Sequence, residues 1–580
     1  MKNKIFIAIF IIMGLYIFSQ AAVDIFDPLY EDIRIWENIG LLNDIPQLRP
    51  YPLQEIKRIL NIVIEKGDAQ QKKTAQDHYN RFFSRKIHFG ARTELNMRFP
   101  KKDQEFVFSP FVDINAEIFK YITVSGNANV FLTNKIPSQS PQPAFQYSKH
   151  DISEDGVYVG KFFLLPVFNT GTAVGTHNYY LSAAIARTDF GPFDNSNIFI
   201  GSQAMHQGQF NFVANQEKWT YTQTLLTLTA KNDLRDGYTY PNKFLTLHSL
   251  NFRPLPWLSI GIVDSIIYGG RLEPIYLLPF SAYFISQGLY GFPDNSLIGG
   301  MFTIKPIRGL RIDGALYSDD IGFNEIVKFK KDAKWRISGQ FGVSYTMSKT
   351  HWFTLADINY TFVTPYCYTH FDNGNFSKPN NQNYTHNGSP LGSNLQPNSD
   401  RIRVKIQFRP LEGFSINIAN TFIRHGNVTE SVYDPVILKE YLLKGTYSTD
   451  GSIFNHSAAT TGEGTETKAK EHAFLYSTPF LTQQTIQYVN QLGLEGVINL
   501  PILKSGGLIQ FKMGYTFEAN INPGVNNNIY NEKIDFSGLN EDQIINKTIN
   551  EANKQLKKWR EKAVGKEFNH YFNIGVKISY

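Results

Sequence analysis

Residues 567–580 read EFNHYFNIGVKISY, in which apolar and polar side chains alternate. In an extended chain, one face would carry Phe568, Phe572, Ile574, Val576, Ile578 and Tyr580, and the other Glu567, Asn569, Tyr571, Asn573, Lys577 and Ser579. A period of two residues predicts a β-strand. Strands of soluble proteins usually have ~5–6 residues, whereas a tilted strand needs ~9–11 residues to cross a bilayer. The 14 residues of this stretch are therefore long enough for a membrane-spanning strand.

The same alternation recurs from about residue 85 to the end of the chain, for example in residues 401–409 and 509–518. The polar faces carry too many charges to pack in the dry core of a sandwich. In an outer-membrane barrel, the apolar faces meet lipid and the polar faces line the lumen, and closure removes every unpaired sheet edge. We therefore predict an all-β transmembrane fold for residues 85–580, a closed antiparallel outer-membrane β-barrel.

The composition agrees with this class. Charged residues make up 19% of the 580 residues, below the ~25% of an ordinary soluble protein. Aromatic residues reach 14%, as expected for the aromatic girdles of a barrel. No stretch of ~18 apolar residues follows residue 20, which argues against a helical membrane protein. The chain ends on Tyr580 at the tip of a predicted strand, which predicts the barrel assembly machinery and outer-membrane lipid as partners.

Residues 1–21 are predicted to be a secretory signal peptide. Lys2 and Lys4 precede an apolar run, and Ser19 and Ala21 are small residues at the positions that a signal peptidase reads. The alternative is a membrane anchor. Removing the two lysines lowers the formal net charge from +6 to +4, which is too near neutral to indicate a nucleic-acid partner. Cys367 is the single cysteine and can form no internal disulfide.

Residues 22–84 are predicted to form a small α-helical bundle in the periplasm. Apolar residues recur there every three or four positions. Asp27-Pro28 is an expected helix start, a second helix is expected from Pro52, and a third from Asp68 towards Phe83. About 60 residues are few for an independent core, so we expect the bundle to dock on the barrel.

Tight turns are predicted at 253–256, 305–309 and 409–413, on the periplasmic side. Long polar outer loops are predicted at about 135–155, 268–296, 365–398, 426–480 and 519–566. The last of these loops contains helical spacing over about residues 541–563. That helix could serve as a lid or plug, or it could cap its own loop.

Two groups of side chains are candidates for ligand binding. Arg401, Arg403, Lys405 and Arg409 share one lumenal face, and Lys86, His88, Arg92 and Arg98 share that of the first strand. Such charge would attract acidic sugars or phosphates, and arginine suits carboxylates in particular. Alternatively, these cations brace the barrel against Glu94, Asp313, Asp357 and Glu518.

The second group lies in a predicted loop and comprises Tyr366, Tyr368, His370, Tyr384 and His386. Their rings could stack on sugars, because a tyrosine or histidine combines an apolar face with a polar tip. The alternative is that they pack the loop or join an interface belt. The sequence contains no nucleophile elbow, phosphate-binding loop or metal-ligand spacing. We therefore expect neither an enzyme nor a cofactor or metal.

Several segments resemble, in order, those of the capsule-assembly outer-membrane barrels of the Wzi type. Gly191-Pro192, preceded by Arg187 and Asp189, resembles that family's Arg-Trp-Trp-Gly-Pro block. Similar segments are Leu41–Leu53, Leu247–Leu250, Ile266–Arg271, Ser318–Ile321, Thr364–His370 and Tyr384–Asn387. The resemblance implies about 18 strands, a periplasmic helical bundle, and a non-catalytic lectin that attaches or organises exported or surface polysaccharide. A porin or specific channel for anionic solutes is the alternative function.

Overall fold

The computed structural model describes residues 24–119, 121–136, 139–146, 157–194, 196–230, 240–319, 336–347, 349, 351–369, 381–427, 430, 435–444, 480–501, 507–527, 529 and 532–580. The predicted signal peptide, at residues 1–21, lies outside them.

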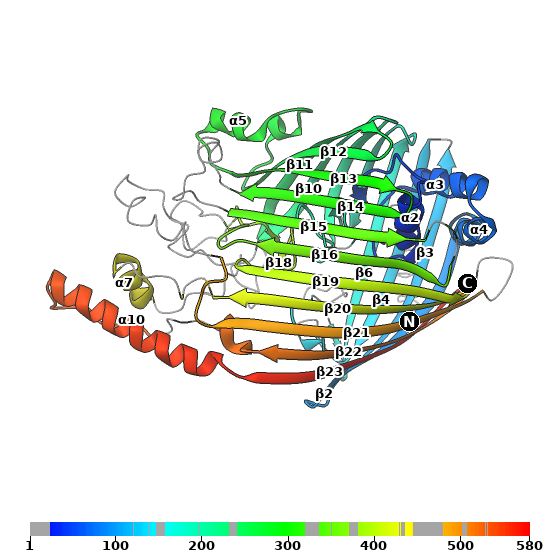
Figure 1. Cartoon of the computed structure of the whole chain (residues 1–580). Helices are drawn as coiled ribbons and strands as arrows, with labels where there is room; N and C mark the ends of the chain where they lie inside the picture. Colours follow the sequence, from blue (N-terminus) through cyan, green and yellow to red (C-terminus); the bar gives the residue numbers. More distant parts are fainter. Residues whose placement is uncertain are drawn as a thin grey trace, which may run out of the picture.

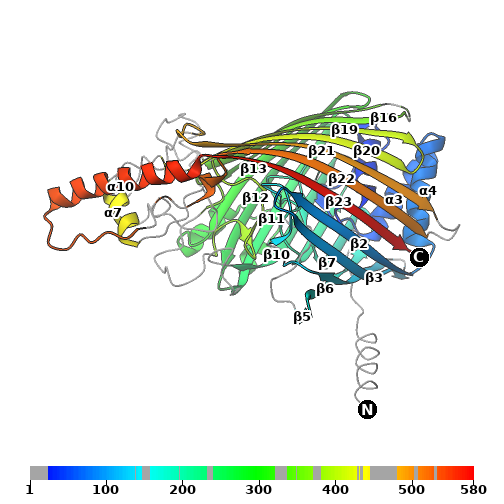
Figure 2. The ribbon, with the colours of Figure 1, turned by 90° about the horizontal axis from the view of Figure 1, so that it is seen from below.

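Eighteen antiparallel strands form a closed barrel, as predicted (Figure 1). In wall order they are β2 (Ile87–Phe99), β3 (Asp103–Phe119), β4 (Ile122–Thr133), β6 (Phe162–Gly175), β7 (Tyr179–Ala186), β9 (Gln207–Asn215), β10 (Trp219–Ala230), β11 (Tyr240–Leu255), β12 (Leu258–Gly269), β13 (Asn295–Ile307), β14 (Leu310–Asp319), β15 (Arg336–Thr346), β16 (Phe353–Val363), β19 (Ser399–Leu411), β20 (Phe414–Gly426), β21 (Ile486–Pro501), β22 (Leu508–Ile521) and β23 (Lys566–Ser579). Strand β23 pairs with β2, in a register that runs from Gly90–Ser579 to Phe99–His570. Figure 2 shows these two strands side by side.

The apolar and polar strand faces predicted from the sequence are also found in the structure. On β23, Phe568 and Ile574 are exposed on the outside of the wall, whereas Asn569 is buried inside it. Met513 on β22 points outward and is 68% exposed. An apolar outer face on a closed barrel places the chain in an outer membrane. Within the described part of the chain, no helix is both long and apolar enough to cross a bilayer.

The two ends of the barrel differ. At one end, here called the turn end, the connections are short, at 120–121, 176–178, 216–218, 256–257, 308–309, 347–352, 412–413 and 502–507. Gly309 and Gly413 reverse the chain with φ of 91° and 72°, a left-handed conformation that favours glycine. The predicted turns at 253–256, 305–309 and 409–413 all belong to this end. The opposite end, called the loop end, carries the long connections, and residues 100–102 form its short exception.

The three predicted N-terminal helices are α2 (Pro28–Asn38), α3 (Leu53–Lys66) and α4 (Ala69–Phe83). Asp27 caps α2 and Asp68 caps α4, as the sequence predicts. Their apolar stripes share a hydrophobic cluster that includes Trp36 and Ile56. The helices lie at the turn end of the barrel (Figure 2).

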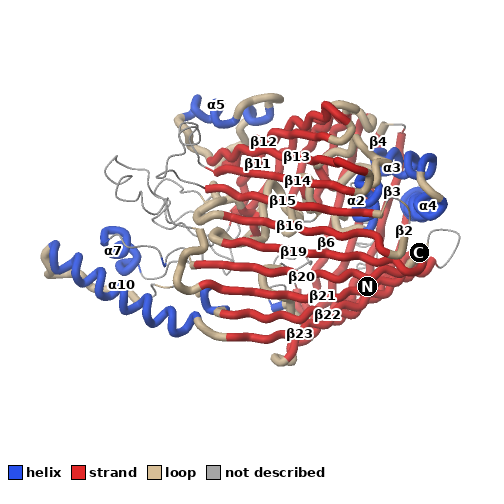
Figure 3. The backbone as a smooth tube through the Cα atoms, viewed as in Figure 1, coloured by secondary structure: helices blue, strands red, loops and turns tan. Residues whose placement is uncertain are grey.

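The predicted late helix is α10 (Glu541–Ala563). It lies at the loop end together with α7 (Pro435–Lys444) and projects away from the barrel (Figure 3). Trp559 and Leu556 of α10 pack in one cluster with Leu442 of α7 and Phe536. Of the two roles considered for this helix, the arrangement favours capping of its own loop over plugging of the lumen.

One predicted loop differs from expectation. Residues 268–296 were expected to form a polar outer loop, but residues 274–292 contain no charged side chain. They include the 3-10 helix η2 (Pro274–Leu277), the helix α5 (Tyr283–Gln287) and the 3-10 helix η3 (Gly288–Tyr290). Figure 1 places α5 outside the wall, beside β11 and β12. The prediction was wrong because the segment packs against the outer surface of the wall, where apolar side chains are favoured.

Candidate functional site: the barrel lumen

Helix α2 is bound to the inner wall of the barrel by ion pairs. Glu31 pairs with Lys405, and Asp32 pairs with Arg409 at 2.6 Å, both on β19. Arg34 binds Asp313 of β14 at 2.6 Å, and Glu37 binds Arg311 of the same strand at 2.7 Å. Four of these groups are buried, namely Asp32, Arg34, Arg311 and Asp313, and the other four are half-buried. The buried charges depend on their partners for stabilisation. The helix is therefore held against two separated parts of the wall.

The environment of the carboxylates on α2 favours their charged forms. Burial alone would raise the pKa of Asp32, but the charge of Arg409 and a hydrogen bond from His78 lower that pKa to about 2. Burial likewise opposes the charge of Glu37, whereas Arg311, Lys305 and Arg34 lower its pKa to about 2. Asp32 and Glu37 are therefore charged at neutral pH and can keep their ion pairs with the wall.

A connection at the loop end, residues 187–206, folds into the lumen. Its strand β8 (Asp189–Phe190) pairs with β1 (Leu48–Arg49), which precedes α3. Arg49 forms an ion pair with Asp189 at 2.6 Å and donates to the Phe193 carbonyl at 2.6 Å. Asn197 donates to both Asp189 and the Phe193 carbonyl. This inward loop is thus fixed by the N-terminal segment.

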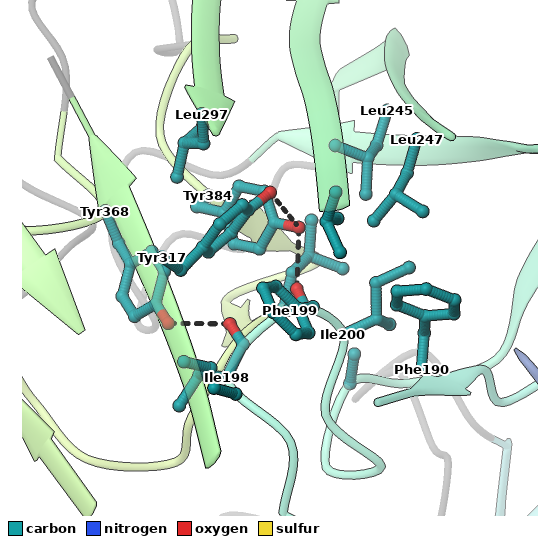
Figure 4. Packing of buried hydrophobic residues seen from close by; sticks show 14 of the residues in the cluster. Phe190, Ile198, Phe199, Ile200, Leu245, Leu247, Leu297, Tyr317, Tyr368 and Tyr384 are labelled. Carbon is teal, nitrogen blue, oxygen red and sulfur yellow. Dashed lines mark hydrogen bonds between the residues drawn. The ribbon is translucent and has the colours of Figure 1, made fainter. Parts of the chain in front are cut away.

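Tyrosines from a second connection, residues 364–398, hold the inward loop from the other side (Figure 4). The Tyr384 hydroxyl donates to the Phe199 carbonyl at 2.7 Å, and the Tyr368 hydroxyl donates to the Ile198 carbonyl at 2.7 Å. The Tyr317 ring meets Phe199 edge-on at a centroid distance of 5.0 Å. These rings belong to a large buried cluster inside the barrel. The inward loop therefore has a packed core of its own within the lumen.

The structure places most of the predicted loop residues in packing positions. Tyr368 and Tyr384 are buried as above, and Tyr366 is buried in the α7–α10 cluster. His386 accepts a hydrogen bond from the Thr229 backbone at 3.1 Å. His370 lies outside the described residues. The packing alternative accounts for the contacts of all four described residues, and their binding of sugars remains a prediction.

Arg187 and Asp189 of the family-like block are also buried. Arg187 donates to the Ser202 carbonyl at 3.0 Å and lies over the Phe26 ring, with 5.3 Å from its guanidinium carbon to the ring centroid. Asp189 forms an ion pair with Arg49 and accepts a hydrogen bond from Asn197. In this structure both residues hold the inward loop in place.

A cavity of about 1920 Å³ lies in the lumen beside these segments. It lies between the N-terminal helices and the wall formed by β19–β23 and β2–β4. It extends to the turn end, where His351, Glu412 and Gly507 line it. Towards the loop end, it is lined by Ala144 and Phe145. The lumen is thus packed on one side and hollow on the other.

Residues 139–146 lie against the inner wall and line this cavity with Ala144, Phe145 and Gln146, and we call them the bridge. Ser140 donates to Glu105 on β3 at 2.6 Å. Four residues later, the Ala144 amide donates to Glu518 on β22 at 2.7 Å, and Gln491 on β21 donates to the Ala144 carbonyl. The bridge therefore links two parts of the wall that are separated by β2 and β23.

The basic face of β19 divides into two pairs. Lys405 and Arg409 are neutralised by carboxylates of α2. They therefore act as structural ion-pair partners, as the alternative to ligand binding predicted, although their partners come from the helix and not from the wall. Arg401 donates to Asn394 at 2.6 Å, while its Nε and Nη2 atoms, although buried, have no hydrogen-bond partner among the residues that the structure describes. Neither Arg401 nor Arg403 has a carboxylate within 4.0 Å among the residues that the structure describes, and both line the cavity. They are the strongest candidates for an anion site.

The four acidic wall residues predicted as braces behave differently from one another. Asp313 binds Arg34 and Arg311, and Glu94 lies 3.4 Å from Arg92. Glu518 accepts hydrogen bonds from the neutral donors Gln491, Asn569 and Tyr571. Among the described residues, Asp357 forms no ion pair within 4.0 Å. No cluster of three metal-ligating side chains occurs in the described part of the chain.

Residues 139–146 and 187–206 form part of the interior of the barrel, and reasoning from the sequence missed this position. The sequence offers a partial signal, since Gln139–Gln146 and Gly191–Ser202 interrupt the strand pattern with apolar side chains that a solvated loop does not need. The sequence contains no comparable signal for the ion pairs between α2 and the wall, because partners such as Arg34 and Asp313 are far apart in the chain.

Solved structures with similar folds include an outer-membrane protein of Escherichia coli. Wzi, described as a carbohydrate-binding β-barrel involved in group 1 capsule assembly, matches with a TM-score of 0.53 and 12% identity, over 96% of this chain and 99% of that chain. This chain has the fold of the Wzi barrel. The fold implied by the resemblance in sequence is therefore confirmed.

Two further matches are OprD of Pseudomonas aeruginosa and OccAB2 of Acinetobacter baumannii. OprD matches with a TM-score of 0.38 and 8% identity, over 85% of this chain and 93% of that one. OccAB2 matches with a TM-score of 0.39 and 8% identity, over 85% of this chain and 97% of that one. No family model and no curated protein matches the sequence.

Acid should release helix α2 from the wall. The pKa values of Asp32 and Glu37 are about 2 in the folded chain and ~4 in an unfolded one. Their stabilising effect is therefore complete above about pH 4.5 and is lost as the pH falls towards 2. Hydrogen exchange of residues 28–38, corrected for intrinsic rates, should be unchanged from pH 7 to about 4.5 and at least about tenfold faster at pH 2.5.

The double variant Asp32→Asn/Glu37→Gln should show this faster exchange already at pH 7. Glu65→Gln, at an exposed position on α3, is the matched control and should exchange like the unmodified protein. Equal protection of α2 at pH 7 and pH 2.5 would contradict the assignment of its anchoring to these carboxylates.

Proposed function

We propose that this protein is a non-catalytic outer-membrane barrel that binds exported or surface polysaccharide. The observation that carries the proposal is the partial filling of the lumen by packed segments. Helix α2, the inward loop and the bridge each occupy it, and each is attached by buried hydrogen bonds or ion pairs. A barrel built for diffusion keeps a water-filled channel. The Wzi barrel, which has the same fold, is described as carbohydrate-binding.

Acidic sugars are the ligand class that fits the cavity. Arg401 and Arg403 point into it without carboxylate partners among the described residues, and a planar guanidinium binds a carboxylate through two parallel hydrogen bonds. Charges in a cavity with low-dielectric walls act more strongly on a ligand than charges at an open surface. Uronic acids and other acidic sugar units carry the group that these arginines select.

A channel for anionic solutes is the second candidate function. The same cavity favours it, because a space of about 1920 Å³ already reaches the turn end. Ala144 and Phe145 of the bridge line that space towards the loop end. The two functions therefore differ in whether the bridge stays in place.

We propose that the turn end, with α2–α4, faces the periplasm and that the loop end faces the outside. An epitope inserted after Gly538, in the connection that leads into α10, should be stained by antibody on intact cells. The same epitope inserted between Pro256 and Trp257 should be stained only after permeabilisation. Staining of the second insertion on intact cells would reverse the orientation.

The unmodified protein should show no steady open state in a planar bilayer, because helix α2, the inward loop and the bridge occupy part of the lumen. Replacement of residues 141–146 by a shorter Gly-Ser linker should produce steady conductance. A variant with the same replacement in the turn at 502–507 is the control and should remain closed. Large, steady conductance of the unmodified protein would favour the channel function.

Purified protein should retain an acidic polysaccharide from the producing cell more strongly than a neutral one, and salt should weaken the retention. Arg403→Gln should weaken binding about tenfold, in line with the ~1.5–3 kcal/mol of a hydrogen bond to a charged group. The double variant Arg401→Gln/Arg403→Gln should weaken it further.

Lys66→Gln/Lys72→Gln removes two charges from exposed positions on α3 and α4 and should leave retention unchanged. If this control weakens binding as much as the arginine variants, net charge and not the cavity governs retention. If no glycan of the producing cell is retained, the polysaccharide proposal fails.

A further inference from the structure

The connection between β12 and β13, residues 270–294, covers part of the outer surface of the barrel. Leu247 and Val263 belong to the buried cluster inside the lumen, so their neighbours His248 and Asp264 point outward. The Tyr283 amide, in the connection, donates to the Asp264 carboxylate at 2.9 Å. We call residues 270–294 the flap (Figure 3).

The flap and the wall share a hydrophobic cluster on the outside of the barrel. Ile266 and Tyr268 of β12 are fully buried there beneath Tyr276 and Tyr283 of the flap. The Tyr283 ring lies 4.4 Å from the His248 ring, measured between centroids. A third contact joins Phe280 to Tyr221 of β10 at 4.6 Å between ring centroids. The flap is thus packed against at least three strands.

The wall beneath the flap carries polar groups that are unusual for a lipid-facing surface. His248 and Asp264 lie opposite one another on β11 and β12, 3.7 Å apart. Gln223 of β10 donates to the Tyr276 carbonyl. Contact of an ionisable side chain with acyl chains is costly. The flap removes these groups from the surroundings of the barrel.

The outer surface of the flap is strongly apolar. Seven of its large apolar side chains are more than half exposed, namely Leu272, Leu278, Phe280, Phe284, Ile285, Leu289 and Phe292. Water is a poor surrounding for a contiguous patch of this kind. The nearby outward residues Ile262 of β12 and Ile298 of β13 are also exposed and face lipid. The apolar surface of the flap therefore continues the lipid-facing band of the wall.

The charges of the connection lie only at its two ends. Arg271 binds Asp294 at 2.6 Å and Glu273 at 3.4 Å. The Tyr276 hydroxyl donates to Asp294 at 2.8 Å. Charged residues at the ends and none between them are typical of a segment whose middle part enters hydrocarbon and whose ends stay in the headgroup region.

We infer that the flap is embedded among the lipid acyl chains in the half of the bilayer next to the loop end. Lipid is the occupant that the surface fits, because the apolar patch is continuous with the band that the strands present to the membrane. At this position the barrel meets the bilayer through a second protein layer. The wall behind it is thereby free to carry His248 and Asp264.

Fluorescence quenching in lipid vesicles tests the inference. Ile285 is 74% exposed, and Ile285→Cys can be labelled with an environment-sensitive fluorophore. Cys367 is fully buried, and the unmodified protein serves as the blank for its labelling. Ile262→Cys is the control for a lipid-facing strand, and Lys554→Cys on α10 is the control for a water-facing position. The migration of unheated samples on an SDS gel, compared with heated ones, verifies that each barrel is folded.

The Ile285 label should be quenched by phosphatidylcholine with a nitroxide on its acyl chain to a similar extent as the Ile262 label. Iodide in the buffer should quench it several-fold less than the Lys554 label. Quenching by iodide without quenching by the lipid would overturn the inference, since the flap would then face water. Protection from both quenchers, with cross-linking between labelled chains, would also overturn it and would assign the surface to a second copy. Phe284→Cys should repeat the result.

Discussion

Hydrocarbon offers no hydrogen-bond partner to a peptide group, and this constraint shapes the whole molecule. The wall meets it by pairing β2 with β23, so that no strand has an open edge. Once the wall is closed, each strand must present apolar side chains outward and is free to carry polar ones inward. The alternation of residues 567–580 is the local form of this requirement.

Closure moves the problem of unpaired polar groups into the lumen. The inner wall carries buried charges such as Asp313 and Arg311, which need partners. Helix α2 supplies some of these partners, and the inward loop fills another part of the space with a packed cluster. The remaining space is the cavity, where Arg401 and Arg403 have no carboxylate within reach among the described residues. The candidate site is thus the part of the lumen that the interior segments leave unfilled.

Local patterns allowed the prediction of the fold. A period of two residues identified the strands and their faces, and helical spacing with Asp27 and Asp68 as caps identified α2 and α4. The flap was missed because an apolar run at a strand end has no signal that distinguishes a loop in water from one packed against the outer wall. Both the flap and the bridge are defined by contacts with strands that are distant in the sequence. The periodicity of a local stretch contains no information on such contacts.

The site was predictable only in part for the same reason. Arg401, Arg403, Lys405 and Arg409 are equivalent in the sequence, since all four lie on the inner face of one strand. The structure separates them by the position of Glu31 and Asp32, more than 350 residues earlier in the chain. The number of cations available for a ligand follows from this pairing and not from the strand pattern.

The short pairing of β1 with β8 has a consequence for cooperativity. It joins residues that precede the first barrel strand to a connection that emerges between β7 and β9. The segments inside the lumen are thus attached both to the N-terminal helices and to the connections of the barrel strands, so they cannot leave the barrel as one separate body. Loss of one of these attachments weakens the others, so the interior segments and the barrel wall should unfold in a single cooperative transition.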